Sequence, residues 1–134
     1  MVLLVLSEIK MLPDILNEIK LMTTRYNNEY WFEILKTNKK LDIWWKYPGT
    51  LHPCCVKLGI AKATDVRKTL GKDIDEFYAK LDGFNSRESM VKCFMNKYNI
   101  NENLFNEHEC VSISWVWNQK FWKSKQTNIN MWLK

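Results

Sequence analysis

The feature that most constrains the fold is a strict alternation near the end of the chain, in the stretch CVSISWVWN at residues 110–118. Large apolar side chains stand at every second position from Val111 to Trp117, with Ser112 and Ser114 between them. Successive side chains of a β-strand point to opposite faces. This stretch is therefore predicted to be a strand with one apolar and one polar face.

Four further strands are predicted ahead of it. The opening MVLLVLS is expected to be a buried first strand, and extended segments are expected at 21–26, 41–47 and 54–68. Gly59 is expected to mark a bend in the last of these, because glycine weakens a regular strand and is typical of tight barrels.

Four helices are expected between the strands. Pro13 suits a first helical turn, and Asn28 is expected to cap the second helix. The third is expected to open with a capping box of Asp73 and Glu76, and the fourth with Asn85 and Glu88. The apolar faces expected for the four helices are Leu12, Ile15, Leu16 and Ile19; Trp31, Ile34 and Leu35; Ile74, Phe77, Tyr78 and Leu81; and Met90, Val91, Phe94 and Tyr98.

This order of elements predicts an α+β domain built around a small, mixed β-barrel with flanking helices. One domain is expected over residues 1–120, followed by a basic tail at 121–134 that carries Trp122 and Trp132. Aromatic side chains interleaved with lysines are able to stack on bases. The alternative is that these tryptophans pack against the domain and anchor the end of the chain.

Composition indicates the kind of partner. The chain of 134 residues is 46% hydrophobic and has a net charge of +5. Its 20 basic residues include only three arginines, Arg25, Arg67 and Arg87. Lysine meets phosphate as a point charge, so nucleic acid would be bound through its backbone or in a pocket. The first apolar run is too short for a signal peptide or a membrane span, so a cytoplasmic protein without a membrane partner is expected.

The cysteines offer one candidate metal site. Cys54, Cys55, Cys93 and Cys110 form no C-x-x-C pair, and reduced thiols are expected. Two H-x-C pairs, His52 with Cys54 and His108 with Cys110, would supply four soft ligands for zinc if they met on strands. Zinc-site spacings are usually tighter and lie in loops, so no metal and no organic cofactor is expected.

The stretch EIKLMTTR at residues 18–25 concentrates charge at the boundary between a helix and a strand. Thr23 and Arg25 would share a face of the strand, and Lys20 would join them from the preceding turn. Two neighbouring cations repel, so we expect an acidic partner, with Asp65 and Asp82 as candidates, or an anionic ligand. The alternative is that both cations are solvated and Thr23 is an ordinary strand residue.

The same stretch resembles the signature of the ASCH domain, a branch of the PUA-like folds, whose motif runs Gly-x-Lys-x-x-Glu-x-Arg. Lys20 and Arg25 match it, while Glu18 replaces the Gly and Thr23 the Glu. Further along, KLGIAKATDVRK resembles the family's central strand, LDGFNSRESMVKCFMNKY its Asp/Glu-Gly-Phe turn and following helix, and VSISWVW its closing strand.

The resemblance implies a small PUA-like barrel with the motif residues in a cleft between barrel and helices, and a role in RNA binding, RNA modification or transcriptional coactivation. One ASCH subgroup carries Lys-x-x-Thr-x-Arg and removes the acetyl group from acetylated cytidine. Its third catalytic residue is a Glu in the turn where Asp82 stands here, one methylene shorter.

The leading hypothesis is binding of RNA or a nucleotide in this cleft. Arg25 and Arg67 would hold the ligand, with Tyr26, Trp44, Trp45 or Trp122 stacking on a base. Trp44 and Trp45 are adjacent on a strand, so at most one of them is free to stack and the other belongs to the core.

Two other hypotheses stay open. The first is an amidohydrolase acting on a modified nucleoside, in which Thr23 would attack the acyl carbon and Lys20 would take the hydroxyl proton. Asp82 would orient Lys20 or protonate the leaving amine, and Arg25 would hold the ligand. In a protein-interaction adaptor, the tail tryptophans would anchor a protein partner.

Overall fold

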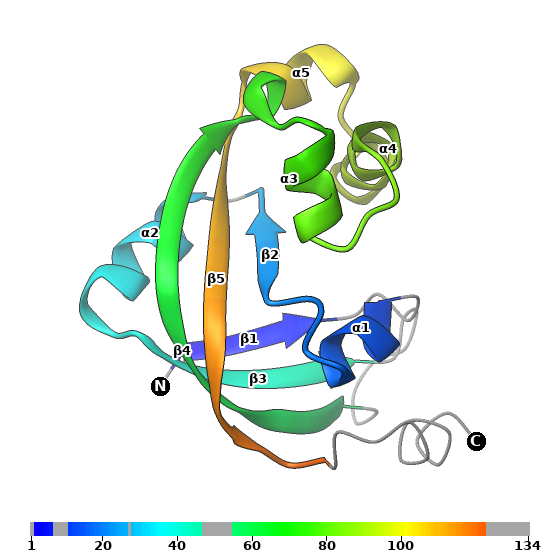
Figure 1. Ribbon diagram of the computed structural model, residues 1–134. Coiled ribbons are helices and arrows are strands. Elements are labelled where there is room, and N and C mark those ends of the chain that lie inside the picture. Colours follow the sequence, from blue (N-terminus) through cyan, green and yellow to red (C-terminus); the bar gives the residue numbers. More distant parts are fainter. Residues whose placement is uncertain (1, 7–10, 27, 47–54, 123–134) are drawn as a thin grey trace.

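The computed structural model describes residues 2–6, 11–26, 28–46 and 55–122 of the chain (Figure 1). A strongly curled sheet forms the centre, and helices flank it. This confirms the predicted α+β class and the barrel-like sheet with flanking helices. Among the described residues, no helix is long and apolar enough to cross a membrane.

The sheet contains the five predicted strands. They are β1 (Val2–Leu6), β2 (Met22–Arg25), β3 (Lys40–Lys46), β4 (Cys55–Leu70) and β5 (Glu109–Lys120). Their order is β1-β3-β4-β5-β2; β1 runs parallel to β3, and the other neighbours are antiparallel. Among the described residues, the sheet therefore has two free edges, β1 and β2.

The pairing of β4 with β5 shifts register at two places, between Ile60 and Ala61 and between Ala63 and Asp65. A further shift, in the pairing of β4 with β3 between Ile43 and Trp44, leaves Leu58 without a partner on β3, and the alternation of β4 breaks there because Leu58 and Gly59 are both buried. Such irregularities bend a strand and increase its twist. Gly59 stands beside the first shift, and a Cβ there would collide with the carbonyl oxygen of Gln119, so the close approach of β5 requires glycine.

Six helical segments surround the sheet in the described part of the chain. They are α1 (Leu12–Leu16), α2 (Asn28–Thr37), a short 3-10 turn η2 (Gly71–Asp73), α3 (Glu76–Leu81), α4 (Arg87–Tyr98) and α5 (Glu102–Glu107). In Figure 1, α3, α4 and α5 gather at one end of the sheet, whereas α2 and α1 lie on opposite sides of it. Helix α5 has no counterpart among the four helices predicted from the sequence.

Several helix boundaries differ from the prediction. Helix α1 ends at Leu16, and the chain then turns through Glu18, whose φ is 61°. Ile19 therefore leaves the predicted apolar face and is 71% exposed. In α3, Phe77 is likewise 70% exposed and Leu81 47% exposed, because the buried side of this short helix is formed by Ala79.

The predicted capping boxes are also displaced. Asp73 lies in η2, and the side chain that caps α3 is Asp75, which accepts a hydrogen bond from the Tyr78 amide at 2.8 Å. The cap of α4 is Ser86, which forms a reciprocal capping box with Ser89. In both cases the true cap is the polar residue whose extended backbone directly precedes the first helical turn.

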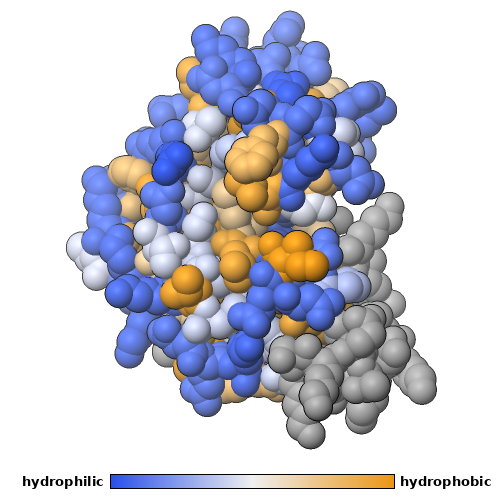
Figure 2. Space-filling view, in the orientation of Figure 1, coloured by the Kyte–Doolittle hydropathy of each residue, from blue (hydrophilic) through white to orange (hydrophobic). Residues whose placement is uncertain are grey.

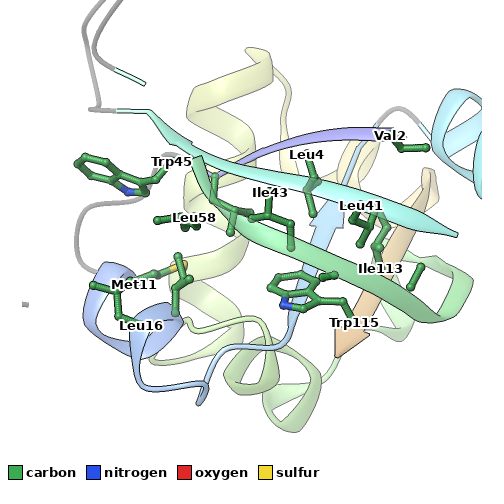
Figure 3. Close-up of a cluster of buried hydrophobic side chains, with 14 of the residues drawn as sticks. Val2, Leu4, Met11, Leu16, Leu41, Ile43, Trp45, Leu58, Ile113 and Trp115 are labelled. Atoms are coloured by element: carbon green, nitrogen blue, oxygen red, sulfur yellow. The ribbon is translucent and has the colours of Figure 1, made fainter. Parts of the chain in front are cut away.

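The core consists of two clusters. The larger one fills the inside of the curled sheet, where β1, β3, β4 and β5 pack against α1 (Figure 3). The second lies between the upper part of the sheet and α3, α4 and α5 and includes Phe94, Phe105 and Cys110. Hydrophobic side chains also reach the surface in the middle of the face shown in Figure 2, with hydrophilic side chains around them.

Trp122 belongs to the larger core cluster. It is 8% exposed, packs edge to face on Trp117, and donates its indole N–H to the carbonyl oxygen of Leu16 at 2.8 Å. Of the two interpretations of the tail tryptophans, packing against the domain is the correct one for Trp122, which is therefore not exposed for a base or a protein partner. Trp132 lies outside the described residues.

Candidate functional site

A pocket lies between the two free edges of the sheet and the helices that face them. Its lining comes from β1, α1, β2, the turn after α3 and helix α4. The polar side chains that line it include Lys20, Thr23, Thr24, Arg25 and Asp82. The structure thus brings together the three motif residues and the distant acid that the sequence analysis singled out.

Lys20 reaches the pocket from the turn between α1 and β2. The carbonyl oxygen of Asp14 accepts the amides of Ile19 and Lys20 at 2.8 and 3.0 Å, which closes this turn. Lys20 is 3% exposed. Its ammonium group donates to the carboxylate of Asp82, to the backbone carbonyl of Asp82, and to the carbonyl of Met22 at 2.6 Å. An ammonium has three N–H donors, so each of them has an acceptor here.

Asp82 is placed by the glycine turn that ends α3. It is the last residue before Gly83, whose φ of 101° favours glycine and turns the chain back toward α1. A Cβ on Gly83 would lie 3.2 Å from the Met11 sulfur and 3.5 Å from Lys20 Cδ, so this turn packs closely on the lysine stem. Burial raises the pKa of Asp82, and the positive charge of Lys20 opposes that rise.

Arg25 connects the two free edges of the sheet. Its Nη2 donates to the carbonyl oxygen of Val5 in β1 at 2.7 Å, and its guanidinium lies 5.5 Å from the ring centre of Trp31. Burial lowers the pKa of Arg25, while Tyr98 and Asp82 act in the opposite direction. Within the described part of the chain, no ion pair joins Arg25 to a carboxylate, and its buried Nε has no hydrogen-bond partner.

The two threonines of β2 differ in their contacts. Both are buried and line the pocket. Thr24 donates its hydroxyl to the phenolic oxygen of Tyr78 at 3.2 Å. No hydrogen bond between the side chains of Thr23 and Lys20 occurs among the described residues. Thr23 therefore shares the pocket with Lys20 without a direct polar contact to it.

Helix α4 supplies a side of the pocket that the sequence analysis missed. Phe94, Lys97 and Tyr98 line it there, and Phe84 lines it after the glycine turn. Phe94 and Tyr98 were predicted to share one helix face, and that face was expected to be core. The sequence signal for this side of the pocket was the spacing of Phe94, Lys97 and Tyr98 at the end of an amphipathic helix.

Tyr26 lies behind this side of the pocket. Its ring stacks on Tyr98 with 4.6 Å between centroids and on His108 with 3.8 Å. The pocket lining includes Tyr98 and not Tyr26. Tyr26, which was predicted to stack on a base, instead packs against Tyr98 and supports its ring. Burial raises the pKa of Tyr98, and Arg25 opposes the rise.

Four other predicted residues lie away from the pocket. Trp45 is 6% exposed and belongs to the core, and Trp44 is half-buried on the opposite face of β3, as expected for neighbours on a strand. The Arg67 side chain is 70% exposed and pairs with Asp65 at 2.9 Å. Trp44, Trp45 and Arg67 do not line the pocket, and Asp65 is not the partner of the motif cations.

The zinc alternative is not tested, because only two of its four candidate ligands, His108 and Cys110, lie in the described residues. The described residues contain no group of three or more His, Cys, Asp or Glu that could hold a metal. Cys110 is fully buried, and burial raises the pKa of its thiol to about 12. His108 contacts the carbonyl oxygen of Tyr26 at 2.5 Å. His52 and Cys54 lie outside the described residues.

Comparison with known proteins supports the fold. No family model matches the chain, and no curated protein matches its sequence. The crystal structure of protein EF3133 from Enterococcus faecalis V583, described by the family model DUF984, is similar to it with a TM-score of 0.52 and 14% identity. The similarity covers 81% of this chain and 68% of that one. It shows a shared fold, and membership of the ASCH family stays a prediction.

Proposed function

We propose that the chain binds RNA or a nucleotide in the pocket between the free edges of its sheet. The observation that carries the proposal is Arg25: a half-buried arginine in the lining, whose buried Nε–H has no hydrogen-bond partner and which has no carboxylate paired with it in the described part of the chain. An unsatisfied buried donor costs about 1–3 kcal/mol, so the site favours a ligand that brings an acceptor oxygen or nitrogen.

The other side chains of the pocket suit a base. Phe84, Phe94 and Tyr98 offer flat apolar surface, and Lys97 adds a cation at an exposed position. The cavity volume is about 60 Å³, enough for a few water-sized groups. The edge of a base would enter toward Arg25, while sugar and phosphate would remain at the open side near Lys97.

Calorimetric titration tests the proposal. Wild-type protein is titrated with the four common ribonucleosides and their 5′-monophosphates. Arg25→Gln removes the charged donor and is expected to weaken binding about 10-fold to 100-fold, the range for hydrogen bonds to charged groups. Tyr98→Leu keeps the cations of the pocket and is expected to weaken binding through lost stacking.

Arg67→Gln is the matched control, since it removes an arginine that lies outside the pocket. It is expected to bind as the wild type does. The proposal is wrong if no nucleoside or nucleotide binds the wild type, or if Arg25→Gln, shown to be folded by thermal melting, binds as tightly as Arg67→Gln.

A second candidate, an amidohydrolase acting on acylated nucleosides, is favoured by one observation: Lys20, Thr23 and Asp82 line the same pocket. The Thr23 oxygen would bond to the acyl carbon as the carbon–nitrogen bond breaks. The hydroxyl proton would pass by way of Lys20 to the leaving amine, and water would then hydrolyse the acyl ester. We rank this function second because Lys20 Nζ donates to three acceptors, none of which is the Thr23 hydroxyl.

Hydrolysis of acetylated cytidine, followed by chromatography, separates the two candidates. If the enzyme hypothesis holds, Thr23→Ala abolishes turnover and Thr23→Ser restores part of it. Wild-type protein that binds cytidine but hydrolyses none of a panel of acylated nucleosides would eliminate the second candidate and leave the first intact.

A further inference from the structure

The outer face of β3 and β4 carries lysines that the pocket does not use. On β3, Leu41, Ile43 and Trp45 are buried in the core, so the residues between them face outward. Lys40 is the direct cross-strand partner of Lys62. Lys46 and Lys57 follow on the same outward face, as the register of the two strands shows. We call Lys40, Lys46, Lys57 and Lys62 the lysine strip.

Positive charge on this face is poorly compensated. Lys57 pairs with Asp42 at 2.9 Å. Lys40, Lys46 and Lys62 have no carboxylate partner within the described ranges, and Lys40 and Lys62 are exposed. Like charges directly opposite on neighbouring strands destabilise a sheet. Lys39 adds a further exposed cation beside Lys40, with its ammonium on the carbonyl of Leu35.

An aromatic side chain stands within the strip. Trp44 is the cross-strand partner of Lys57 and shares the outward face with Lys40 and Lys46. It is half-buried, so part of the indole faces outward. At about 3.3 Å per residue, the distance from Lys40 to Lys46 is roughly 20 Å, which is the length of several nucleotides in a single strand. Cations in a row with an aromatic between them match the pattern of single-strand binding surfaces.

We propose that the lysine strip binds the phosphate backbone of single-stranded RNA, with Trp44 stacking on a base. The strip lies on the face of β3 and β4 that points away from the core, whereas the pocket is lined from the edge strands β1 and β2. Figure 1 shows that the sheet which carries both is strongly curled. The outer face of a curled sheet touches a flat bilayer only over a narrow area, while a flexible strand is able to follow the curve. The proposal does not depend on occupation of the pocket.

Salt-dependent binding of a fluorescein-labelled oligouridylate of about twelve nucleotides tests the strip. For single strands, log K falls with log salt by about 0.7 for each neutralised phosphate. Lys40→Gln/Lys46→Gln/Lys62→Gln is therefore expected to reduce the slope by about 2 and to weaken binding on the order of 100-fold at 0.1 M salt. Lys57 is kept, so its ion pair with Asp42 is undisturbed.

Lys72→Gln/Lys80→Gln/Lys92→Gln is the matched control. It changes the net charge equally, and its lysines are exposed on η2, α3 and α4. We expect its salt slope to match that of the wild type and its affinity to change by less than about threefold, because its lysines lie off the strip. Trp44→Leu is expected to weaken binding about 10-fold with an unchanged slope, since it removes stacking and no charge.

The proposal is overturned if both triple variants lose binding equally, if the strip variant keeps the wild-type slope, or if duplex RNA binds as tightly as the single strand. Binding of phosphatidylserine vesicles without binding of the oligouridylate would overturn it in favour of a membrane. Nucleoside binding in the pocket should survive in the strip variant, so the two proposals fail independently.

Discussion

At the scale of single residues, the unusual feature is an ion pair at nearly complete burial. Lys20 is 3% exposed and the Asp82 side chain 4% exposed, in a protein whose other ion pairs among the described residues are at least partly solvated. Removing two charges from water costs several kcal/mol for each ion, and only excellent geometry offsets it. A pair of this kind is weak evidence for stability and better evidence that the site needs both groups.

A double-mutant cycle tests this interpretation. Asp82→Ala leaves the Lys20 ammonium buried without its carboxylate and is expected to destabilise the fold by about 3–5 kcal/mol. Adding Lys20→Met to Asp82→Ala is expected to restore part of that loss. Urea unfolding of the wild type, both single variants and the double variant gives the coupling energy. Strictly additive losses would contradict a buried, mutually dependent pair.

At the scale of elements, the site depends on where short helices begin and end. Helix α3 has only six residues, and its last turn delivers Asp82 to Lys20. A helix this short is marginal by itself and depends on packing and capping. The N-cap of α3 therefore helps to hold Asp82 in its position in the pocket, because it stabilises the helix that carries this residue.

Substitution of two nearby aspartates distinguishes the observed N-cap of α3, Asp75, from the predicted one, Asp73. Asp75→Ala removes the acceptor of the Tyr78 amide and is expected to cost about 1 kcal/mol of unfolding free energy. Asp73→Ala, in η2, is expected to stay within about 0.5 kcal/mol of the wild type. Chemical denaturation monitored by tryptophan fluorescence measures both. The reverse ranking would show that the capping box predicted from sequence forms in solution.

At the scale of the whole molecule, contacts between distant parts of the chain hold the curled sheet in place. Arg25 joins β2 to β1, which are the opposite edges of the sheet. Trp122, just beyond β5, packs into the main core and donates to the end of α1. The segment after residue 120 thus contributes to the domain that was predicted over residues 1–120.

Trp122→Ala is expected to destabilise the protein by about 3–5 kcal/mol, the usual cost of truncating a buried tryptophan. The neighbouring Phe121 is 43% exposed, and Phe121→Ala is expected to cost about 1 kcal/mol or less. Thermal unfolding of the two variants makes the comparison. Equal, small effects would mean that Trp122 does not anchor the end of β5.

What the sequence determined by itself is local. The apolar opening run and the extended patterns after it predicted all five strands, helical spacing predicted the buried faces of α2 and α4, and the adjacent pair Trp44 and Trp45 divided between outside and core as expected. These patterns are readable because side-chain direction follows directly from backbone geometry. The spacing of Lys20, Thr23 and Arg25 favoured a meeting of the three side chains, whereas the choice between Asp65 and Asp82 as the acid beside them stayed open until the pocket was seen.

Only the tertiary structure decided the rest. The slips in β4, the exposure of Ile19 and Phe77, and the location of Trp122 follow from how a strongly curled sheet closes on its helices. The contribution of α4 to the pocket and the meeting of lysines on the outer face of β3 and β4 depend on pairings between residues far apart in the chain. Local propensity carries no information about such pairings, because their free energy arises only when the distant segments are already in contact.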